Sequence, residues 1–418
     1  MKAATAIILA AGHGTRMNSA KPTALHEVAG RPVIDWMLTA LESCTEERPV
    51  IVDGPERQIA AHVGERARVV VQQRPEGEAD ALRTALAEVS ATGKELILAL
   101  HGNLPLIDRE YLDAIMQVAE RDGAAYFIHA GEEAENAFYA CGIFCAQAAL
   151  LRKSIAHGAA QDALETCFAG MGAHTLMICG LHCPGVTDRK ALALCETLAN
   201  TAIIERHFAN GVTMLNPESV HIGAEVEIGR DTVLWPNVVL TGRTVIGEGC
   251  VIKPGCQLND TRVGDGCTLT CVVADGAVVG SNVKAGPFVN LRPDTRIADG
   301  CKIGDFVEVK NSNVGEGTKL PHLSYIGDAD VGSGVNVGCG CVFVNYDGYA
   351  KHRTTVGNDV FLGCQTNLIA PVTVGDGAYT AAGSTITHDV PAGAMAFARA
   401  RQSNKEGYVE KFRSLKKK

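Results

Sequence analysis

Two glycines near the amino terminus have the spacing of a phosphate-binding loop. Residues 9–17 include Ala11, Gly12, Gly14 and Arg16, and they directly follow an apolar run that predicts a strand. Glycines let a backbone approach a phosphate closely, N–H groups at a turn and at a helix start favour negative charge, and an arginine pairs with phosphate oxygens. These four residues are therefore candidate nucleotide-binding residues.

A second polar group lies in the carboxy-terminal half, at residues 345–353, where a regular pattern is interrupted. This segment contains amide, aromatic, acidic and basic side chains. An insertion into a repeat must leave it as a loop, and loops on a rigid scaffold commonly carry function. We therefore expect a binding site at this loop.

The interrupted pattern is an aliphatic residue at every sixth position of residues 222–392. This period fits neither an α-helix nor a continuous alternating strand. It fits a left-handed parallel β-helix, in which three short strands form each coil and aliphatic side chains stack in columns. Four positions after the aliphatic residue we expect a small inward-facing residue. This position holds Val226, Thr232, Val238, Thr244, Cys250, Cys256, Cys267, Cys301 and Cys341.

The first 187 residues alternate apolar strand-like runs with amphipathic helical stretches. Strands are predicted at 6–9, 68–71, 95–100 and 125–130, and helices at 33–41 and 79–89. This alternation predicts a largely parallel, Rossmann-like α/β sheet. The predicted division of the chain is an α/β domain at 1–187, a linker helix at 188–212, the β-helix at 213–392 and a tail at 393–418.

Composition limits the classes of partner. The chain has 418 residues, with 38 Lys and Arg against 47 Asp and Glu, so its formal charge is -9. A surface that follows nucleic-acid phosphates needs an excess of basic residues, so we expect no nucleic-acid partner. No apolar run is long enough to span a membrane and no signal peptide is recognised, so we expect a cytoplasmic protein with no membrane partner.

Fifteen cysteines are present. The pairs Cys141/Cys145 and Cys179/Cys183 have three intervening residues, which differs from the spacing of a structural zinc site. We expect reduced thiols that mostly pack as small hydrophobic side chains.

The string at residues 9–17 resembles the signature of sugar-phosphate nucleotidyltransferases. Together with the β-helix, the chain is similar to the GlmU family from residue 3 to its end. This resemblance implies acetylation of glucosamine 1-phosphate by acetyl-CoA, followed by joining of the product to UMP from UTP. It also implies a place in the biosynthesis of UDP-N-acetylglucosamine, a precursor of cell-wall peptidoglycan.

The resemblance is weakest at the family's uridylyltransferase residues. Thr23 stands where the family has a triphosphate-binding lysine, and Glu78 and Asp80 stand in its uridine-reading segment. Asn103 replaces the metal-binding aspartate, which leaves Asp188, in the matching second segment, as the anionic candidate for Mg²⁺. Because phosphoryl transfer depends on positioning and charge neutralisation, we expect weak or lost uridylyltransferase activity.

The acetyltransferase motifs match closely. By resemblance, Arg292, Lys310 and Lys351 hold the sugar phosphate, while Tyr325 and Asn336 orient the sugar. Three cations around one dianion form a chemically sensible phosphate site. The matching motifs occupy residues 288–293, 304–310, 322–328, 335–338 and 345–348.

His322 matches the family's general base. An ammonium group must lose a proton to attack a thioester, and an imidazole is suited to accept it near neutral pH. Glu308 is the candidate to orient or stabilise this imidazole. Pro321, where the family has Gly, is a departure beside the base.

Further resemblance concerns acetyl-CoA. Positions that contact the coenzyme in the family are occupied here by Asn345, Tyr346, Ala382, Arg399, Cys339 and Cys364, and the two cysteines replace small residues. A β-helix with one protruding loop presents half a site on each face, so we expect a homotrimer with sites between subunits.

Three alternatives remain. In the first, the chain retains both activities, with Lys21 and Asp188 as substitutes for the lost groups. In the second, it acetylates a different amino sugar, since Pro321 and Tyr349 adjoin the expected pocket. In the third, it is a non-catalytic scaffold that binds sugar nucleotides.

Overall fold

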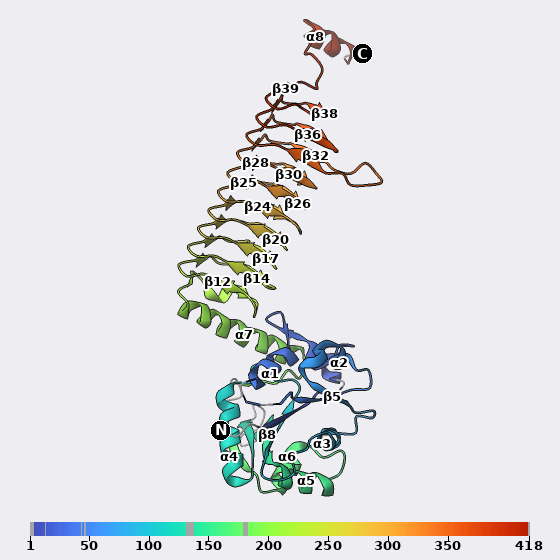
Figure 1. The fold of residues 1–418 in the computed structure, drawn as a ribbon, viewed down its shortest axis with the longest axis vertical. Coiled ribbons are helices and arrows are strands. Elements are labelled where there is room, and N and C mark those ends of the chain that lie inside the picture. The colour runs from blue at the N-terminus through green and yellow to red at the C-terminus, as the bar shows by residue number, and fades with distance from the viewer. Residues whose placement is uncertain are drawn as a thin grey trace. The chain divides into compact units, whose positions relative to one another are not determined.

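The computed structural model describes residues 4–12, 14–42, 44–45, 47–130, 138–178 and 183–416. The chain forms two compact units, Met1–Ile203 and Ile204–Lys418 (Figure 1). The division falls within α7 (Arg189–Ala209), a helix of 21 residues. In the described ranges, no helix has the length and apolar character needed to cross a membrane.

The first unit contains a seven-stranded sheet in the order β5-β4-β1-β6-β8-β7-β9. All its pairings are parallel except those of β8, so the predicted largely parallel α/β sheet is confirmed. The strands at residues 50–53, 138–147 and 174–177 were not predicted. The strands are β1 (Thr5–Leu9), β4 (Val50–Asp53), β5 (Arg68–Val71), β6 (Leu96–His101), β7 (Ala124–Ala130), β8 (Phe138–Gln147) and β9 (His174–Met177).

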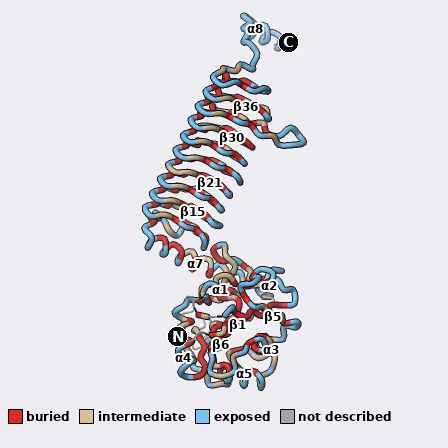
Figure 2. The backbone as a smooth tube through the Cα atoms, viewed as in Figure 1, coloured by how far each residue is buried: buried red, intermediate tan, exposed pale blue. Residues whose placement is uncertain are grey.

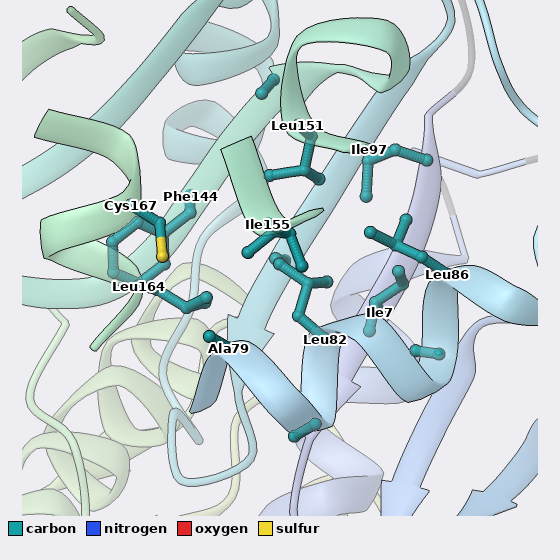
Figure 3. Packing of buried hydrophobic residues seen from close by; sticks show 14 of the residues in the cluster. Ile7, Ala79, Leu82, Leu86, Ile97, Phe144, Leu151, Ile155, Leu164 and Cys167 are labelled. Atoms are coloured by element: carbon teal, nitrogen blue, oxygen red, sulfur yellow. The ribbon is translucent and has the colours of Figure 1, made fainter. Parts of the chain in front are cut away.

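Helices cover this sheet because each has an apolar face. Figure 3 shows Leu82 and Leu86 of one helix packing with Leu151 and Ile155 of another, against strand residues such as Ile97. All five side chains are buried. The helices are α1 (Val33–Leu41), α2 (Gln58–Val63), α3 (Glu78–Ala87), α4 (Arg109–Asp122), α5 (Ala148–His157) and α6 (Leu164–Gly170).

The second unit is the predicted left-handed parallel β-helix, built from three parallel sheets. The 11-stranded sheet contains β10 (Thr213–Met214), β13 (Val233–Leu234), β16 (Val251–Ile252), β19 (Thr268–Leu269), β22 (Lys284–Ala285), β25 (Lys302–Asp305), β28 (Lys319–His322), β31 (Asn336–Val337), β34 (Phe361–Leu362), β37 (Tyr379–Thr380) and β39 (Met395–Ala396). Its strands lie one coil apart.

The other two sheets complete each coil. The 10-stranded sheet contains β11 (His221–Ile222), β14 (Val239–Thr241), β17 (Gln257–Asn259), β20 (Val272–Asp275), β23 (Val289–Leu291), β26 (Glu308–Lys310), β29 (Tyr325–Gly327), β32 (Val342–Val344), β35 (Asn367–Ile369) and β38 (Thr385–Ile386). The 9-stranded sheet contains β12 (Glu227–Ile228), β15 (Val245–Ile246), β18 (Arg262–Val263), β21 (Val278–Val279), β24 (Arg296–Ile297), β27 (Asn313–Val314), β30 (Ala329–Val331), β33 (Thr354–Val356) and β36 (Val372–Val374).

The interior of the β-helix follows the predicted columns, and Figure 2 shows buried and exposed positions alternating along the coils. Every residue predicted for the small inward position is buried, including Cys250, Cys267 and Cys301. These three thiols also donate to backbone carbonyl oxygens, for example from Cys267 Sγ to Gly280 O at 3.0 Å. The six-residue period therefore accounts for these cysteines without a chemical role.

The predicted loop projects from the β-helix between β32 and β33 (Figure 1). Arg353 anchors its end, because its guanidinium contacts Asp330 at 2.6 and 2.8 Å and donates to two backbone carbonyl groups. Within the loop, Asp347 accepts hydrogen bonds from two backbone N–H groups and pairs with His352 at 2.7 Å. These contacts hold the pKa of Asp347 well below its usual range. The loop therefore has internal order.

Candidate functional site

The first unit has a cavity of about 540 Å³ at the carboxyl ends of β1 and β6. The nucleotide-binding candidates Ala11, Gly12, Gly14 and Arg16 all line it, as does Thr23. Gly14 has a φ of 52°, and a Cβ at this position would collide with the Thr23 hydroxyl. The glycine is therefore required by both backbone conformation and space.

One carboxylate lines this cavity where the family reads uridine. Glu78 Oε1 lies 3.3 Å from Nε2 of His101, and Glu78 Oε2 accepts from the N–H of Leu164 at 2.9 Å. Burial by itself would raise the pKa of Glu78, but the contact with His101 outweighs it and the net shift is downward. Glu78 is therefore held as an anion. Asp80, in contrast, pairs with Gln72 at 2.6 Å and with Arg83.

The two metal candidates do not form a cation site. The Asn103 amide donates to Val186 O at 3.1 Å, and its Oδ1 is buried without a partner. Asp188 Oδ1 accepts from Ala191 N–H at 2.9 Å, which lowers the pKa of this carboxyl. Mg²⁺ at phosphate sites is usually held by one or two carboxylates together with substrate phosphates and water. These two residues offer a single carboxylate, which already accepts a backbone N–H. Across the described ranges, no three His, Cys, Asp or Glu side chains are arranged to hold a metal.

The predicted phosphate-binding cations meet on the 10-stranded sheet. Arg292 and Lys310 directly follow Leu291 and Val309, which are paired in register on adjacent coils. Adjacent parallel strands are about 4.8 Å apart, so these cations lie one above the other. The next residue in this column is Gly327, which has no side chain. The Tyr325 ring takes the space beside Gly327, so the column presents two cations next to this ring.

Lys351, from the projecting loop, joins this cluster. Its ammonium lies beside that of Lys310, and this contact lowers the pKa of Lys351. Lys310 Nζ is 4.0 Å from Asp328 Oδ2. Two ammonium groups held together at the mouth of a loop form an anion-binding arrangement, because a bound anion relieves their repulsion.

A buried polar network supports the cations. Asp328 accepts from Asn311 Nδ2 at 2.5 Å and from the amide of Asn345, which also lies 3.4 Å from the Tyr325 hydroxyl. Burial would raise the pKa of Asp328, but these hydrogen bonds and the lysines lower it overall. A Cβ on Gly327 would collide with the Tyr325 ring. Asn345, predicted at the cofactor, is thus placed with the sugar-phosphate residues.

The base candidate lies at the carboxyl end of β28, an interior strand of the 11-stranded sheet. His322 and Asp305 are paired in register, and His322 Nδ1 is 2.7 Å from Asp305 Oδ1. This contact lowers the pKa of Asp305. Because the carboxylate accepts, Nδ1 carries the proton and Nε2 presents its lone pair. This is the form in which an imidazole acts as a general base.

Within one chain, Glu308 contacts Arg292 and not the imidazole, for which a role of Glu308 was expected. Glu308 Oε1 is 2.9 Å from a guanidinium nitrogen of Arg292, and it raises the pKa of that group. The reason is its place in the fold, since Glu308 pairs with Tyr325 in the 10-stranded sheet, whereas His322 belongs to the 11-stranded sheet. Asp305 was missed because it is 17 residues from His322, and one coil of parallel pairing brings them together.

The coenzyme candidates continue the column that begins at Asp305 and His322. Asn336 pairs with Lys319, so Cys339 occupies on its coil the position of His322 on the preceding one. Cys364 follows, because Gln365 N–H donates to Cys339 O at 2.7 Å. Gly383 N–H donates to Cys364 O at 2.8 Å, which places Ala382 next. The order along the column is Asp305, His322, Cys339, Cys364 and Ala382.

Arg399 lies beyond the end of this column, with its Cδ 3.9 Å from the place of a Cβ on Gly383. Tyr346 is half-exposed on the loop, and its hydroxyl donates to Gly348 O at 2.7 Å. Asn336 lies on the 11-stranded sheet, away from the face that carries Tyr325 and the cations. The acceptor residues of one chain are therefore divided between two sheets. Of the cysteine pairs considered earlier, Cys179 lies outside the described residues.

Comparisons with known proteins agree with this architecture. Residues 6–168 match the MobA-like NTP transferase domain, and residues 276–311 and 353–388 match the bacterial transferase hexapeptide family. The bifunctional protein GlmU of Geobacillus sp. (strain WCH70) is 38% identical over 454 aligned positions, covering 99% of this chain and 98% of that protein. Those positions outnumber the 418 residues here, so this chain carries deletions relative to that protein.

Two further relatives have the same name. The bifunctional protein GlmU of Caldanaerobacter subterraneus subsp. tengcongensis is 38% identical, with 98% of each chain covered. That of Streptomyces avermitilis is 35% identical, covering 99% of this chain and 95% of that one. Identity at this level over nearly the whole chain shows that the protein belongs to the GlmU family, and that it is an enzyme with the β-helix of an N-acetyltransferase.

Proposed function

We propose that this protein transfers the acetyl group of acetyl-CoA to the amine of glucosamine 1-phosphate, giving N-acetylglucosamine 1-phosphate for UDP-N-acetylglucosamine biosynthesis. The main support is the Asp305–His322 pair at one end of a column that leads through Cys339 and Cys364 to Arg399. A carboxylate-oriented imidazole is suited to deprotonate an amine. The elongated column suits an elongated acyl donor.

In the proposed reaction, the phosphate binds between Arg292, Lys310 and Lys351. The ammonium of the sugar first releases one proton to solvent. The neutral amine then attacks the thioester carbonyl carbon, and Nε2 of His322 accepts a second proton from the nitrogen. A tetrahedral oxyanion forms and is stabilised by backbone N–H groups at the coil. The thiolate of coenzyme A then leaves and takes the proton from the imidazolium, which returns His322 to its starting state.

His322→Ala tests this assignment. We expect kcat for acetyl transfer to fall by roughly 10²- to 10⁴-fold, the usual contribution of acid–base catalysis. His388, an exposed histidine near the last coils, provides the control, because it lies at the corner between the 10-stranded and 9-stranded sheets and not on the 11-stranded sheet that carries the column. Full activity in correctly assembled His322→Ala protein would exclude the proposed base.

We propose that the active form is a homotrimer. One chain carries its base on the 11-stranded sheet and its cations on the 10-stranded sheet, so a second copy is suited to complete the site. Mixing His322→Ala chains with Lys310→Ala chains tests this. If acetyl transfer returns when the two inactive variants assemble into mixed trimers, the site is shared between subunits. If the mixed trimers stay inactive, a shared site is contradicted.

We also propose that uridylyltransferase activity is weak or lost. The support is a cavity lined by Glu78, Thr23 and Asn103, with Arg16 as its cation. A fixed anion in this cavity disfavours a nucleoside triphosphate. Because the Mg²⁺ candidates do not fit the ion, no step is assigned to it.

The second candidate function retains both activities. The cavity of about 540 Å³ favours it, because this volume still admits a ligand of nucleotide size. Pyrophosphate release from UTP with N-acetylglucosamine 1-phosphate separates the two candidates. Release at rates comparable to acetyl transfer would replace the first proposal for this unit. The cytoplasmic location stays a prediction.

A further inference from the structure

Two cysteines differ from the other described cysteines by facing outward next to the proposed reaction centre. Cys364 is the one exposed cysteine in the described part of the chain, and Cys339 is partly exposed. Ten of the fourteen described cysteines are buried, and several of these fill inward positions of the β-helix. Packing therefore explains the buried thiols but leaves Cys339 and Cys364 without a structural role.

The two thiols belong to adjacent coils at equivalent positions. Asn336 pairs with Phe361 and Val337 with Leu362, and the bond from Gln365 N–H to Cys339 O continues this register to Cys339 and Cys364. Paired residues on neighbouring parallel strands lie about 4.8 Å apart, and disulfides span Cα separations of about 4.4–6.8 Å. The backbone spacing therefore permits a disulfide between these residues.

The pair also adjoins the base. His322 occupies the equivalent position one coil before Cys339, and its Nε2 is free to accept a proton because Nδ1 is engaged by Asp305. A thiolate, and not a thiol, attacks a disulfide, so a neighbouring proton acceptor favours exchange. On the other side, the column continues to Ala382 and Arg399, along the path assigned above to the acyl donor.

We propose that Cys339 and Cys364 form a thiol modification site, which a low-molecular-weight disulfide oxidises to an intramolecular disulfide that stops acetyl transfer. This inference rests on the proposed function for its effect on activity, but not for its chemistry. The disulfide would cover the coil between the imidazole and the rest of the column. Acetyl-CoA then could not bring its thioester to His322.

The chemistry is a balanced exchange. The thiolate of Cys364, the more exposed residue, attacks one sulfur of RSSR, breaks the S–S bond and expels RS⁻, which takes up a proton. The thiolate of Cys339 then attacks the Cys364 sulfur of the mixed disulfide and expels the second RS⁻. Two protein thiols lose two electrons and two protons, and RSSR becomes two RSH.

Two disulfides serve as probes on the full-length, fully reduced protein. Oxidised glutathione tests general thiol exchange, and the disulfide of coenzyme A tests whether the acyl-donor path directs the reagent. Product formation is measured by mass spectrometry of the acetylated sugar, and disulfides are mapped by peptide mass analysis without reduction. We expect a Cys339–Cys364 linkage, loss of activity and recovery with a dithiol. If the coenzyme A disulfide reacts faster than oxidised glutathione, the acyl-donor path directs the oxidant to these cysteines. Equal rates for the two reagents would indicate general thiol exchange.

Three variants make the outcome specific. In Cys339→Ser, Cys364 is expected to stop at the mixed disulfide, and in Cys364→Ser no linkage should form. Cys271 is a partly exposed cysteine at the same corner of the β-helix but four coils before Cys339, and its Sγ contacts Pro254 O. It is the matched control, because Cys271→Ser removes a thiol that has no cysteine on the next coil, and this variant should behave like the unmodified chain. Each variant is compared with its own reduced activity.

Failure of this inference is distinguishable from failure of the proposed function. Suppose that Cys339 and Cys364 remain unlinked after treatment with either disulfide and that the protein still acetylates glucosamine 1-phosphate normally. This result would overturn the modification site. The same conclusion follows if the linkage forms without loss of activity, or if the double serine variant is equally inhibited. A mapped linkage in a protein that never acetylates this sugar would instead overturn the proposed function and leave the thiol chemistry standing.

Discussion

Asp305 and His322 are paired on adjacent coils, and 2.7 Å separates Oδ1 of the first from Nδ1 of the second. The lone pair of Nε2 is therefore directed away from the carboxylate. This relationship assigns the orienting role to Asp305, and it leaves Glu308 with Arg292.

Asp305→Asn should lower kcat by roughly 10²- to 10⁴-fold, close to the effect of removing the base. The amide can donate to Nδ1, which would move the ring proton to Nε2 and abolish its lone pair. Glu308→Gln is the matched control, and its main effect should be on KM for the sugar phosphate, because Glu308 contacts Arg292. Steady-state kinetics of both variants decide the matter. A larger loss of kcat in Glu308→Gln than in Asp305→Asn would restore Glu308 as the orienting carboxylate.

Lys351→Met should raise KM for the sugar phosphate by roughly 10- to 100-fold, the scale of a lost hydrogen bond to a charged group. Lys310 lowers the pKa of Lys351, so Lys351 loses its charge at a lower pH than an isolated lysine. We therefore expect KM to rise as pH increases into the alkaline range. Lys351→Arg keeps its charge there and should flatten this rise. An unchanged pH profile in Lys351→Arg would argue against this explanation.

His207 should make the second unit less stable as the pH falls. This histidine of α7 is buried, and burial lowers its pKa from 6.5 to about 4. Between these values the unfolded chain binds a proton that the folded chain does not, so the free energy of unfolding should fall by up to about 1.4 kcal/mol per pH unit. Above pH 6.5 this contribution is constant.

Denaturant unfolding at a series of pH values measures this slope. His207→Gln should reduce it, while the exposed His388→Gln should leave it unchanged. Equal slopes in the unmodified protein and in His207→Gln would show that another group is responsible.

Thr23→Lys combined with Asn103→Asp should increase pyrophosphate release from UTP. These changes return a cation and a metal-binding carboxylate to a cavity that both residues line. Thr197→Lys, at an exposed position of α7, controls for added charge elsewhere. If the unmodified chain already releases pyrophosphate as fast as the double variant, the proposal that its uridylyltransferase activity is weakened is contradicted.

The amino-acid sequence by itself determined the architecture of both units and the identity of most candidate residues. The six-residue period predicts the β-helix because each coil must bury an aliphatic side chain per sheet, and burial of positions such as Cys250 and Cys301 follows from the same period. The glycines of residues 9–17 likewise predict a turn after a strand. Strand β8 was not predicted, although it pairs with β7, the strand directly before it in the chain.

The tertiary structure decided which of these residues meet. The spacing from Asp305 to His322 is 17 residues, whereas Cys339 and Cys364 are separated by 25, because the loop at 345–353 lies between them. Because the coils differ in length, the residues of the column are not evenly spaced in the sequence. Residues on either side of a corner of the β-helix belong to different sheets. Within one chain, Asp305 therefore contacts His322, whereas Glu308, which is closer to His322 in sequence, contacts Arg292. Parallel pairing between coils, and not proximity along the chain, sets the chemistry of this site.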